Sequence, residues 1–92
     1  MSAPFPPEAP VQIAPGYRFQ WEEAQQVYVL LYPEGMITLN DAASEILKRC
    51  DGSRTANSII ADLEQQFPGA ELKNDVLEFL EDARDKGWIC SA

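Results

Sequence analysis

Four carboxylates follow one another closely near the end of the chain, at Glu78, Glu81, Asp82 and Asp85. Carboxylates gathered in one pocket can act as general acids or bases, or bind a metal ion. At helical spacing, however, most of these four point away from the apolar stripe of the same segment. We interpret them as a solvated helix face, with acid–base groups or metal ligands as the alternative.

The two cysteines, Cys50 and Cys90, lie far apart, and the chain contains no histidine. The absence of C-x-x-C spacing argues against a metal site and a redox pair. There is also no glycine-rich phosphate loop and no nucleophile beside a local base. The sequence therefore predicts a protein that is not an enzyme and has no cofactor and no metal. We interpret both cysteines as free thiols, with a Cys50–Cys90 disulfide as the alternative.

Length and charge narrow the class of protein further. Ninety-two residues suit one domain, and 7 Lys and Arg against 15 Asp and Glu give a net charge of −8. This charge opposes binding to polyphosphate, so we expect no nucleic-acid partner. No apolar run approaches the roughly 20 residues of a membrane span, and the first residues lack the pattern of a signal peptide. We therefore predict a cytoplasmic protein with no membrane partner.

Prolines concentrate at the start of the chain, where five of the seven fall within the first fifteen residues. Proline removes backbone donors, so residues 1–16 are predicted to form an extended or disordered arm without a helix or a central strand. Residues 17–92 are predicted to form the single domain. The arm is either a loose tail or a segment that lies against another chain, an alternative kept open by Phe5, Val11 and Ile13.

Alternation of apolar and polar residues over 17–21 predicts a half-buried strand. Val27–Tyr32 is apolar on both faces and so fits a central strand. Pro33 fixes the first corner of a turn, and we expect Gly35 to close it in the left-handed conformation. The short segment 36–39 then folds back as the last strand of a three-stranded meander. Its outer edge is predicted to be open, and an open edge can accept a peptide.

The apolar character of both faces of the central strand has two interpretations. The helices and the N-terminal arm could cover them, or Tyr28, Leu30 and Tyr32 could form a contact patch for a second subunit or an enzyme. Met36 has a similar ambiguity, since methionine serves equally as an adaptable contact residue and as a core filler.

Three helices are predicted after the sheet. Asn40 caps the first, over about 41–50, and Thr55 caps the second, which ends before Pro68. The third runs over about 72–86 and ends at Gly87. The predicted fold class is α+β and winged-helix-like, with a three-stranded antiparallel sheet followed by three α-helices.

Winged helices often bind DNA through the penultimate or last helix, but the charge of this chain contradicts that use. Between residues 71 and 85 the last helix carries six acidic residues. Only Lys73, Asn74, Arg84 and Lys86 could contact phosphates or base edges. The scaffold is therefore better suited to peptide binding than to DNA.

Several motifs occur in an order that carries a family resemblance. They are Tyr32-Pro33-Glu34-Gly35 with Leu39-Asn40, then Ile46-Leu47, Asp51-Gly52-Ser53-Arg54-Thr55, Asp75-Val76 with Phe79-Leu80, and Gly87-Trp88-Ile89. Over about residues 13–89 the chain resembles the pyrroloquinoline quinone (PQQ) biosynthesis protein D family. The resemblance implies a peptide chaperone that presents the ribosomally made PQQ precursor peptide to a radical S-adenosylmethionine (SAM) enzyme, which cross-links a glutamate to a tyrosine. The same fold serves as the precursor recognition element of many peptide-modifying systems.

The resemblance also implies a site, in a cleft between the third strand and the last helix. The residues expected to bond the guest backbone are Met36, Ile37, Thr38, Leu39 and Asn40. Three residues of the last helix, Leu77, Leu80 and Arg84, lie on a side that could border this cleft. Arg84 either meets a guest carboxylate or pairs on the surface with Glu81 or Glu78.

Three function classes thus remain at the level of sequence. The first is a non-enzymatic peptide carrier, which we expect to be a monomer or a weak homodimer. The second is a winged-helix nucleic-acid binder, and the third is a structural dimerisation module.

Overall fold

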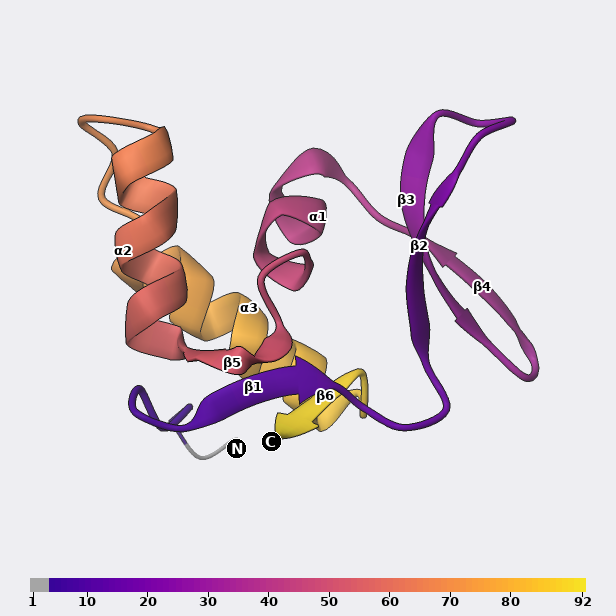
Figure 1. The fold of residues 1–92 in the computed structure, drawn as a ribbon, viewed down its shortest axis with the longest axis horizontal. Helices are drawn as coiled ribbons and strands as arrows, with labels where there is room; N and C mark the ends of the chain where they lie inside the picture. Colours follow the sequence, from indigo (N-terminus) through magenta and orange to yellow (C-terminus); the bar gives the residue numbers. More distant parts are fainter. Residues whose placement is uncertain (1–3) are drawn as a thin grey trace.

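Two three-stranded antiparallel sheets and three helices make up residues 4–92, the part of the chain described by the structure, which is a computed structural model (Figure 1). One sheet has the order β5 (Asp51–Thr55), β1 (Pro10–Ile13), β6 (Ile89–Ser91). The other has the order β2 (Arg18–Glu22), β3 (Val27–Tyr32), β4 (Gly35–Thr38). The helices are α1 (Asp41–Leu47), α2 (Ala56–Gln66) and α3 (Lys73–Asp85).

The predicted meander and the three helices are confirmed, but the order of one sheet followed by helices is wrong. Strand β5 lies between α1 and α2, and β6 follows α3. Both strands are short and largely polar or mixed, so neither shows the period-two apolar pattern that identifies a strand in a sequence. Both strands are held in place by pairing with β1, a strand that was not predicted from the sequence.

Strand β1 corrects the prediction that the proline-rich segment contains no central strand. It pairs with β5 on one side and β6 on the other, and Val11 is completely buried. Pro10 occupies the first position of the strand, where a missing N–H is tolerated. The next proline is Pro15, so residues 11–14 keep the backbone donors that a central strand needs.

The segment before β1 lies against this chain's own core. Phe5 is buried, and the Asn57 backbone N–H donates to the Pro7 carbonyl oxygen at 3.0 Å. The Asn57 side chain also donates to the Glu8 carboxylate at 2.7 Å. Residues 1–3 of the predicted arm lie outside the described residues.

The turn between β3 and β4 differs from the prediction in one respect. Tyr32 pairs with Gly35, so Pro33 and Glu34 alone form a two-residue turn. Gly35 is not in the left-handed region, which corrects its predicted role. A Cβ atom at this position would lie 3.4 Å from the Tyr32 hydroxyl oxygen, which is ordinary van der Waals contact, so neither space nor backbone conformation requires glycine here.

Both predicted helix caps are confirmed. The Asn40 side chain accepts from the Ala43 N–H at 2.8 Å, and the Thr55 hydroxyl accepts from the Ser58 N–H at 3.1 Å. Helix α1 ends at Leu47, earlier than expected. Gly87 takes a φ of 81° after α3, which turns the chain so that the Trp88 N–H reaches the Ala83 carbonyl.

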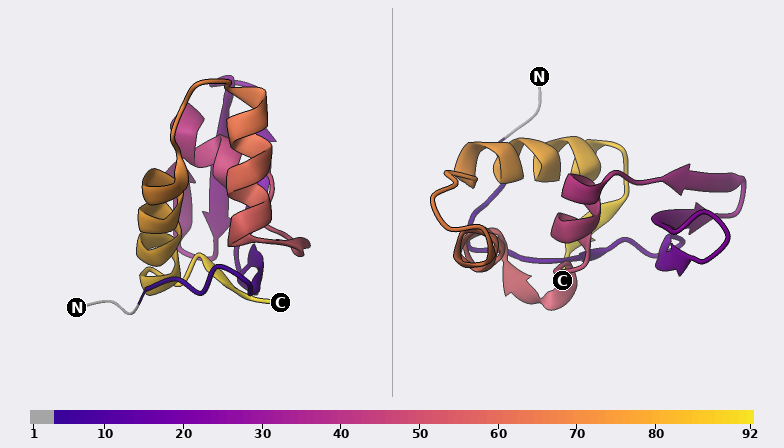
Figure 2. Two further views of the ribbon diagram at one scale, coloured as in Figure 1. Left: turned by 90° about the vertical axis from the view of Figure 1, so that its left-hand side faces the viewer. Right: turned by 90° about the horizontal axis from the view of Figure 1, so that it is seen from above.

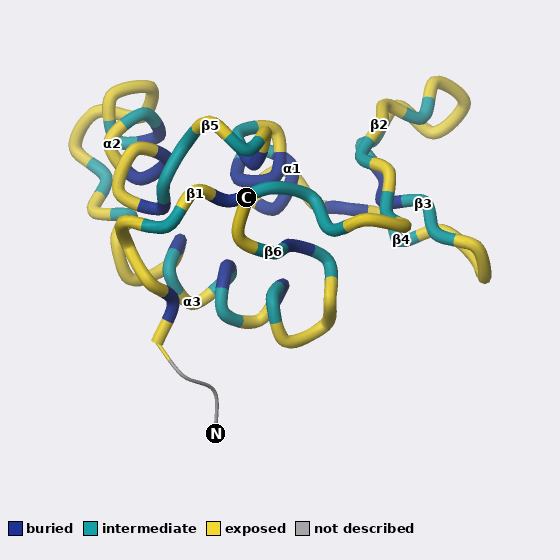
Figure 3. Tube along the Cα trace, turned by 60° about the horizontal axis from the view of Figure 1, so that its bottom comes forward, coloured by how far each residue is buried: buried dark blue, intermediate teal, exposed yellow. Residues whose placement is uncertain are grey.

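The core joins the helices to one face of each sheet. Its largest fully buried side chains include Leu30 of β3, Leu47, Ile59 and Leu80. Sheet β2–β3–β4 stands at one end of the molecule next to α1, and α2 lies at the other end (Figures 1 and 2). Buried positions accordingly concentrate on the helices and in the middle of β3, whereas the ends of the β2–β3–β4 sheet are exposed (Figure 3).

Candidate functional site

The outer edge of β4 is open. Within residues 4–92, β4 pairs only with β3, through Val29 opposite Thr38 and Leu30 opposite Ile37. This confirms that the strand is an edge strand, the condition for adding a guest chain.

The direction of the free backbone groups follows from the register. The Leu39 N–H donates to the Tyr28 carbonyl oxygen at 3.0 Å, immediately after the last pair of the ladder. In an antiparallel ladder the inward and outward backbone groups alternate. Ile37 therefore shares the inward direction of Leu39, and the N–H and C=O groups of Met36 and Thr38 point to the open edge.

The side chains of the predicted guest-binding segment, residues 36–40, differ in their exposure to solvent. Met36 is 42 % exposed, so it is available for contact and is not a core filler. Thr38 is also exposed, whereas Ile37 is half-buried against the core and Leu39 is buried. Asn40 caps α1. The surface that this segment offers to a guest is thus centred on Met36 and Thr38.

The predicted residues of α3 divide between core and surface. Leu80 is completely buried, which corrects its predicted place as an accessible wall of the cleft. Arg84 lies with its guanidinium 5.6 Å from the centre of the Phe5 ring and 3.5 Å from the Asp85 carboxylate. Leu77 is half-buried and precedes Arg84 by about two turns, so both share the flank that meets the N-terminal segment.

The opposite flank of α3 faces α1. Leu72, Asp75 and Val76 line a groove together with residues of α1 and α2. Phe79 continues this flank at i+3 from Val76 and is half-buried. Sequence reasoning missed Phe79 as a candidate, although its apolar character and spacing were visible. The grouping of Leu77 and Arg84 beside β4 stays a prediction.

The predicted contact patch on β3 is divided between the interior and two half-buried tyrosines. Leu30 is completely buried, so it is not part of a surface patch, and this prediction is wrong for that residue. Tyr28 stacks on Phe19 with ring centres 4.8 Å apart. Tyr32 contacts Tyr17, with ring centres 5.7 Å apart. This face of the sheet is the one that packs on the core, as the alternative interpretation expected.

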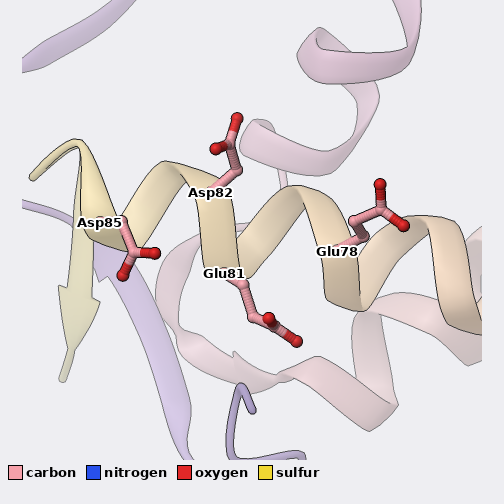
Figure 4. Close-up of a pocket in the computed structure, with 4 residues that line it drawn as sticks. All are labelled: Glu78, Glu81, Asp82 and Asp85. Carbon is pink, nitrogen blue, oxygen red and sulfur yellow. The ribbon is translucent and has the colours of Figure 1, made fainter. Parts of the chain in front are cut away.

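The four carboxylates share one face of α3 and line an open hollow of about 380 Å³, with Glu78 and Asp82 pointing to one side of that face and Glu81 and Asp85 to the other (Figure 4). Asp82 accepts from the Lys86 ammonium at 2.8 Å. Within residues 4–92, no group of three or more potential metal-ligating side chains is placed to hold a metal ion. The arrangement is that of a charged helix face.

A charged cluster connects α1 to α2. The Arg49 guanidinium pairs with Asp62 and, at 3.0 Å, with Glu45. The hydrogen bond from Arg49 holds the pKa of each carboxyl below its usual value. The cluster therefore links α1, which follows β4, to α2.

Both cysteines are free thiols, as preferred at the sequence level. Burial, with a smaller contribution from the charge of Asp51, raises the pKa of Cys50 to about 12. Its thiol donates to the Ile46 carbonyl oxygen at 3.4 Å. Cys90 is half-buried in β6.

Among the helices of residues 4–92, none has the length and apolarity needed to cross a membrane.

Comparison with known proteins adds independent evidence. The family model described as coenzyme PQQ synthesis protein D (PqqD) matches residues 28–89. The chain is 55 % identical over 76 residues to the PqqA binding protein of Acinetobacter baylyi, covering 82 % of this chain and 77 % of that protein. It is 58 % identical over 79 residues to the PqqA binding protein of Pseudomonas putida strain W619, covering 85 % of this chain and 87 % of that protein.

A solved structure is similar over nearly the whole chain. It is the solution structure of the PqqD truncation of Methylobacterium extorquens PqqCD, described as a functional and stand-alone recognition element for ribosomally synthesized and post-translationally modified peptides. The TM-score is 0.75 at 27 % identity, with 94 % of each chain covered.

Proposed function

Because this chain belongs to the coenzyme PQQ synthesis protein D (PqqD) family, we propose that it binds the PqqA precursor peptide and presents it to the radical SAM enzyme that modifies the peptide. Relatives that cover most of the chain carry the name PqqA binding protein, and the similar solved structure is described as a peptide recognition element. Presentation to the enzyme is the part of the proposal that comes from the family resemblance.

The observation that carries the proposal is the open edge of β4. The precursor peptide adds to the β2–β3–β4 sheet as a fourth strand, and its backbone pairs with the outward N–H and C=O groups of Met36 and Thr38. Backbone pairing tolerates many guest sequences, so side chains must supply the selectivity. The exposed Met36 side chain can adapt to differently shaped apolar guests.

Helix α3 contributes a second wall in this proposal. Phe79 lies on the flank toward α1, and Leu80 supports the wall from the core. Leu77 and Arg84 are the candidates for a guest segment that passes over the other flank. There a guest carboxylate would compete with Phe5 for the Arg84 guanidinium.

Further properties complete the proposal. The chain acts without catalysis, in the cytoplasm, as a monomer or weak homodimer, with a winged-helix-like arrangement of β2–β4 and the three helices. A net charge of −8 supports a partner other than nucleic acid or an anionic membrane.

The decisive experiment is a titration of ¹⁵N-labelled protein with the PqqA precursor peptide, using a variant designed for the edge. Thr38→Pro removes one outward N–H and leaves the β3–β4 ladder in place, because that N–H faces solvent. We expect the amides of Met36 and Thr38 to shift first in the parent protein and Thr38→Pro to weaken binding at least about tenfold.

Two controls make the titration specific. Thr38→Ala keeps the N–H and should bind the peptide nearly as well as the parent. Trp21→Pro alters β2, the other edge of the sheet, and should leave the affinity unchanged if the guest adds to β4. Shifts confined to β2, or equal binding by Thr38→Pro and Thr38→Ala, would show that the edge of β4 is not the site.

A further inference from the structure

The molecule has a second apolar surface, away from the sheet edge. Helices α1, α2 and the start of α3 enclose an open groove of about 430 Å³. Ile46, Leu63 and Val76 form its apolar floor, and Phe67 stands at its margin with 45 % of its surface exposed. A large aromatic side chain that remains this exposed beside an apolar groove is typical of a protein contact surface.

The rim of the groove is acidic. Asp41, Glu45 and Asp75 line it. Glu45 pairs with Lys48 and Arg49, but Asp41 and Asp75 form no ion pair with any residue from 4 to 92. Each of these two lies in the first turn of its helix, where a carboxylate is favourable to the helix dipole. Two carboxylates without an ion-pair partner in residues 4–92, at the mouth of an apolar groove, also favour a cationic ligand.

The walls of the groove indicate which secondary structure its ligand has. All three walls are helical or follow a helix, so the groove offers side chains and not the row of free backbone groups that an added strand needs. An amphipathic helix satisfies its own backbone and presents apolar side chains on one face. A second copy of this chain is a poor ligand for this acidic groove, since its own net charge is −8.

We propose that this groove docks a basic amphipathic helix of a partner protein, with an apolar side chain against Phe67 and Lys or Arg beside Asp41 and Asp75. Only Leu39 and Asn40 separate Asp41 from the end of β4 at Thr38. No residue of β4 lines the groove, so a partner in the groove leaves the outward backbone groups of Met36 and Thr38 free in this proposal. The two surfaces can be occupied together.

The test uses two synthetic peptides of about five helical turns. The basic peptide has leucine at i, i+3, i+4 and i+7 with lysine on both flanks of this stripe, and the acidic peptide replaces every lysine by glutamate. Titrated into ¹⁵N-labelled protein, the basic peptide should shift groove amides such as Ala42 and Ala70. The acidic peptide should bind at least about tenfold more weakly at low salt, and the difference should shrink as salt screens the charges.

Variants separate the apolar and the charged contributions. Phe67→Ala should weaken the basic peptide at least about tenfold, and the exposed position of Phe67 makes the variant compatible with folding. Asp41→Asn combined with Asp75→Asn should reduce the preference for the basic over the acidic peptide several-fold, and the remaining preference reflects Glu45 and the net negative charge of the chain. Trp21→Ala removes an equally exposed aromatic side chain outside the groove and should leave binding of the basic peptide unchanged.

The outcomes distinguish this inference from the function proposed above. Equal affinity for both peptides, no binding by either, or shifts outside the groove would overturn the docking proposal. Binding of the precursor peptide to Phe67→Ala at parental affinity is expected, because the two surfaces are separate. If the basic peptide occupies the groove while the precursor fails to shift Met36 and Thr38, the docking site stands and the carrier function falls.

Discussion

At the scale of single residues, neighbouring side chains on one strand or helix differ in whether they pack in the core or face solvent. In β4, Met36 and Thr38 face outward, whereas Ile37 packs on the core. In α3, Leu80 is completely buried and Leu77 is only half-buried. The side chain that contributes most to stability is therefore not the one that can contact a guest.

This difference gives a prediction for two leucines of α3. Leu80→Ala should lower the free energy of unfolding by about 2–5 kcal/mol, because it leaves a cavity in the core. Leu77→Ala should cost distinctly less, since its side chain is already partly in water. Denaturant unfolding of both variants measures the difference. Equal losses would mean that Leu80 is not the interior residue described here.

The two thiols should differ in reactivity. Burial raises the pKa of Cys50 to about 12, so almost no thiolate forms at neutral pH, and access is blocked as well. Cys90 is only half-buried. We expect a thiol reagent to modify Cys90 first and Cys50 only after unfolding, as mass spectrometry of peptides from a time course would reveal. Rapid labelling of Cys50 in the folded protein would contradict its burial.

At the scale of elements, the connection between α1 and α2 depends on one cation. Arg49 pairs with both Asp62 and Glu45, and it lowers the pKa of each carboxyl. A carboxyl whose pKa is lower in the folded state contributes stability above its usual pKa. That contribution is lost as the pH falls through its folded value.

The Arg49 cluster therefore predicts a pH-dependent effect of substitution. Arg49→Met should destabilise the protein at neutral pH, and its difference from the parent should shrink as the pH falls below the ordinary carboxyl range. Denaturant unfolding at several pH values tests this. Arg54→Met is the matched control, because the Arg54–Asp51 pair is longer, at 3.5 Å, and more exposed. A constant effect of Arg49→Met across pH would exclude the ionic origin.

Helices and the meander could be predicted from sequence, because their signals are local. Asn40 and Thr55 each cap a helix through a hydrogen bond to the N–H three residues later. Val27–Tyr32 is apolar throughout, which indicates a central strand. Strands β5 and β6 could not be predicted, since each exists through pairing with β1 far away in the sequence. The open edge of β4 was therefore predictable from local turns. The α3 wall of the site could not be predicted, because it depends on which flank of the helix packs toward α1, and that is a long-range contact.

At the scale of the whole molecule, the proline-rich start of the chain is a structural component. Val11 is in the core, and β1 is the strand that joins β5 to β6. Two distant parts of the sequence, in β5 and β6, thus depend on one four-residue strand.

Removal of residues 1–14 should consequently unfold the protein or lower its thermal midpoint strongly, because β5 and β6 lose their shared partner. Phe5→Ala, which keeps β1, should cost less than this deletion. Circular dichroism melts compare the two. A deletion protein that melts like the parent would show that β1 is dispensable, and the binding experiments could then be performed without it.

The pairing of β1 with β6 also brings distant positions of the chain to one pole. The Ala92 N–H donates to the Pro10 carbonyl oxygen at 3.0 Å. A tag joined genetically behind Ala92 would consequently be tethered beside the start of β1. β4 belongs to the other sheet, so fluorescent or affinity tags can be attached at this pole while the peptide-accepting edge is left unobstructed.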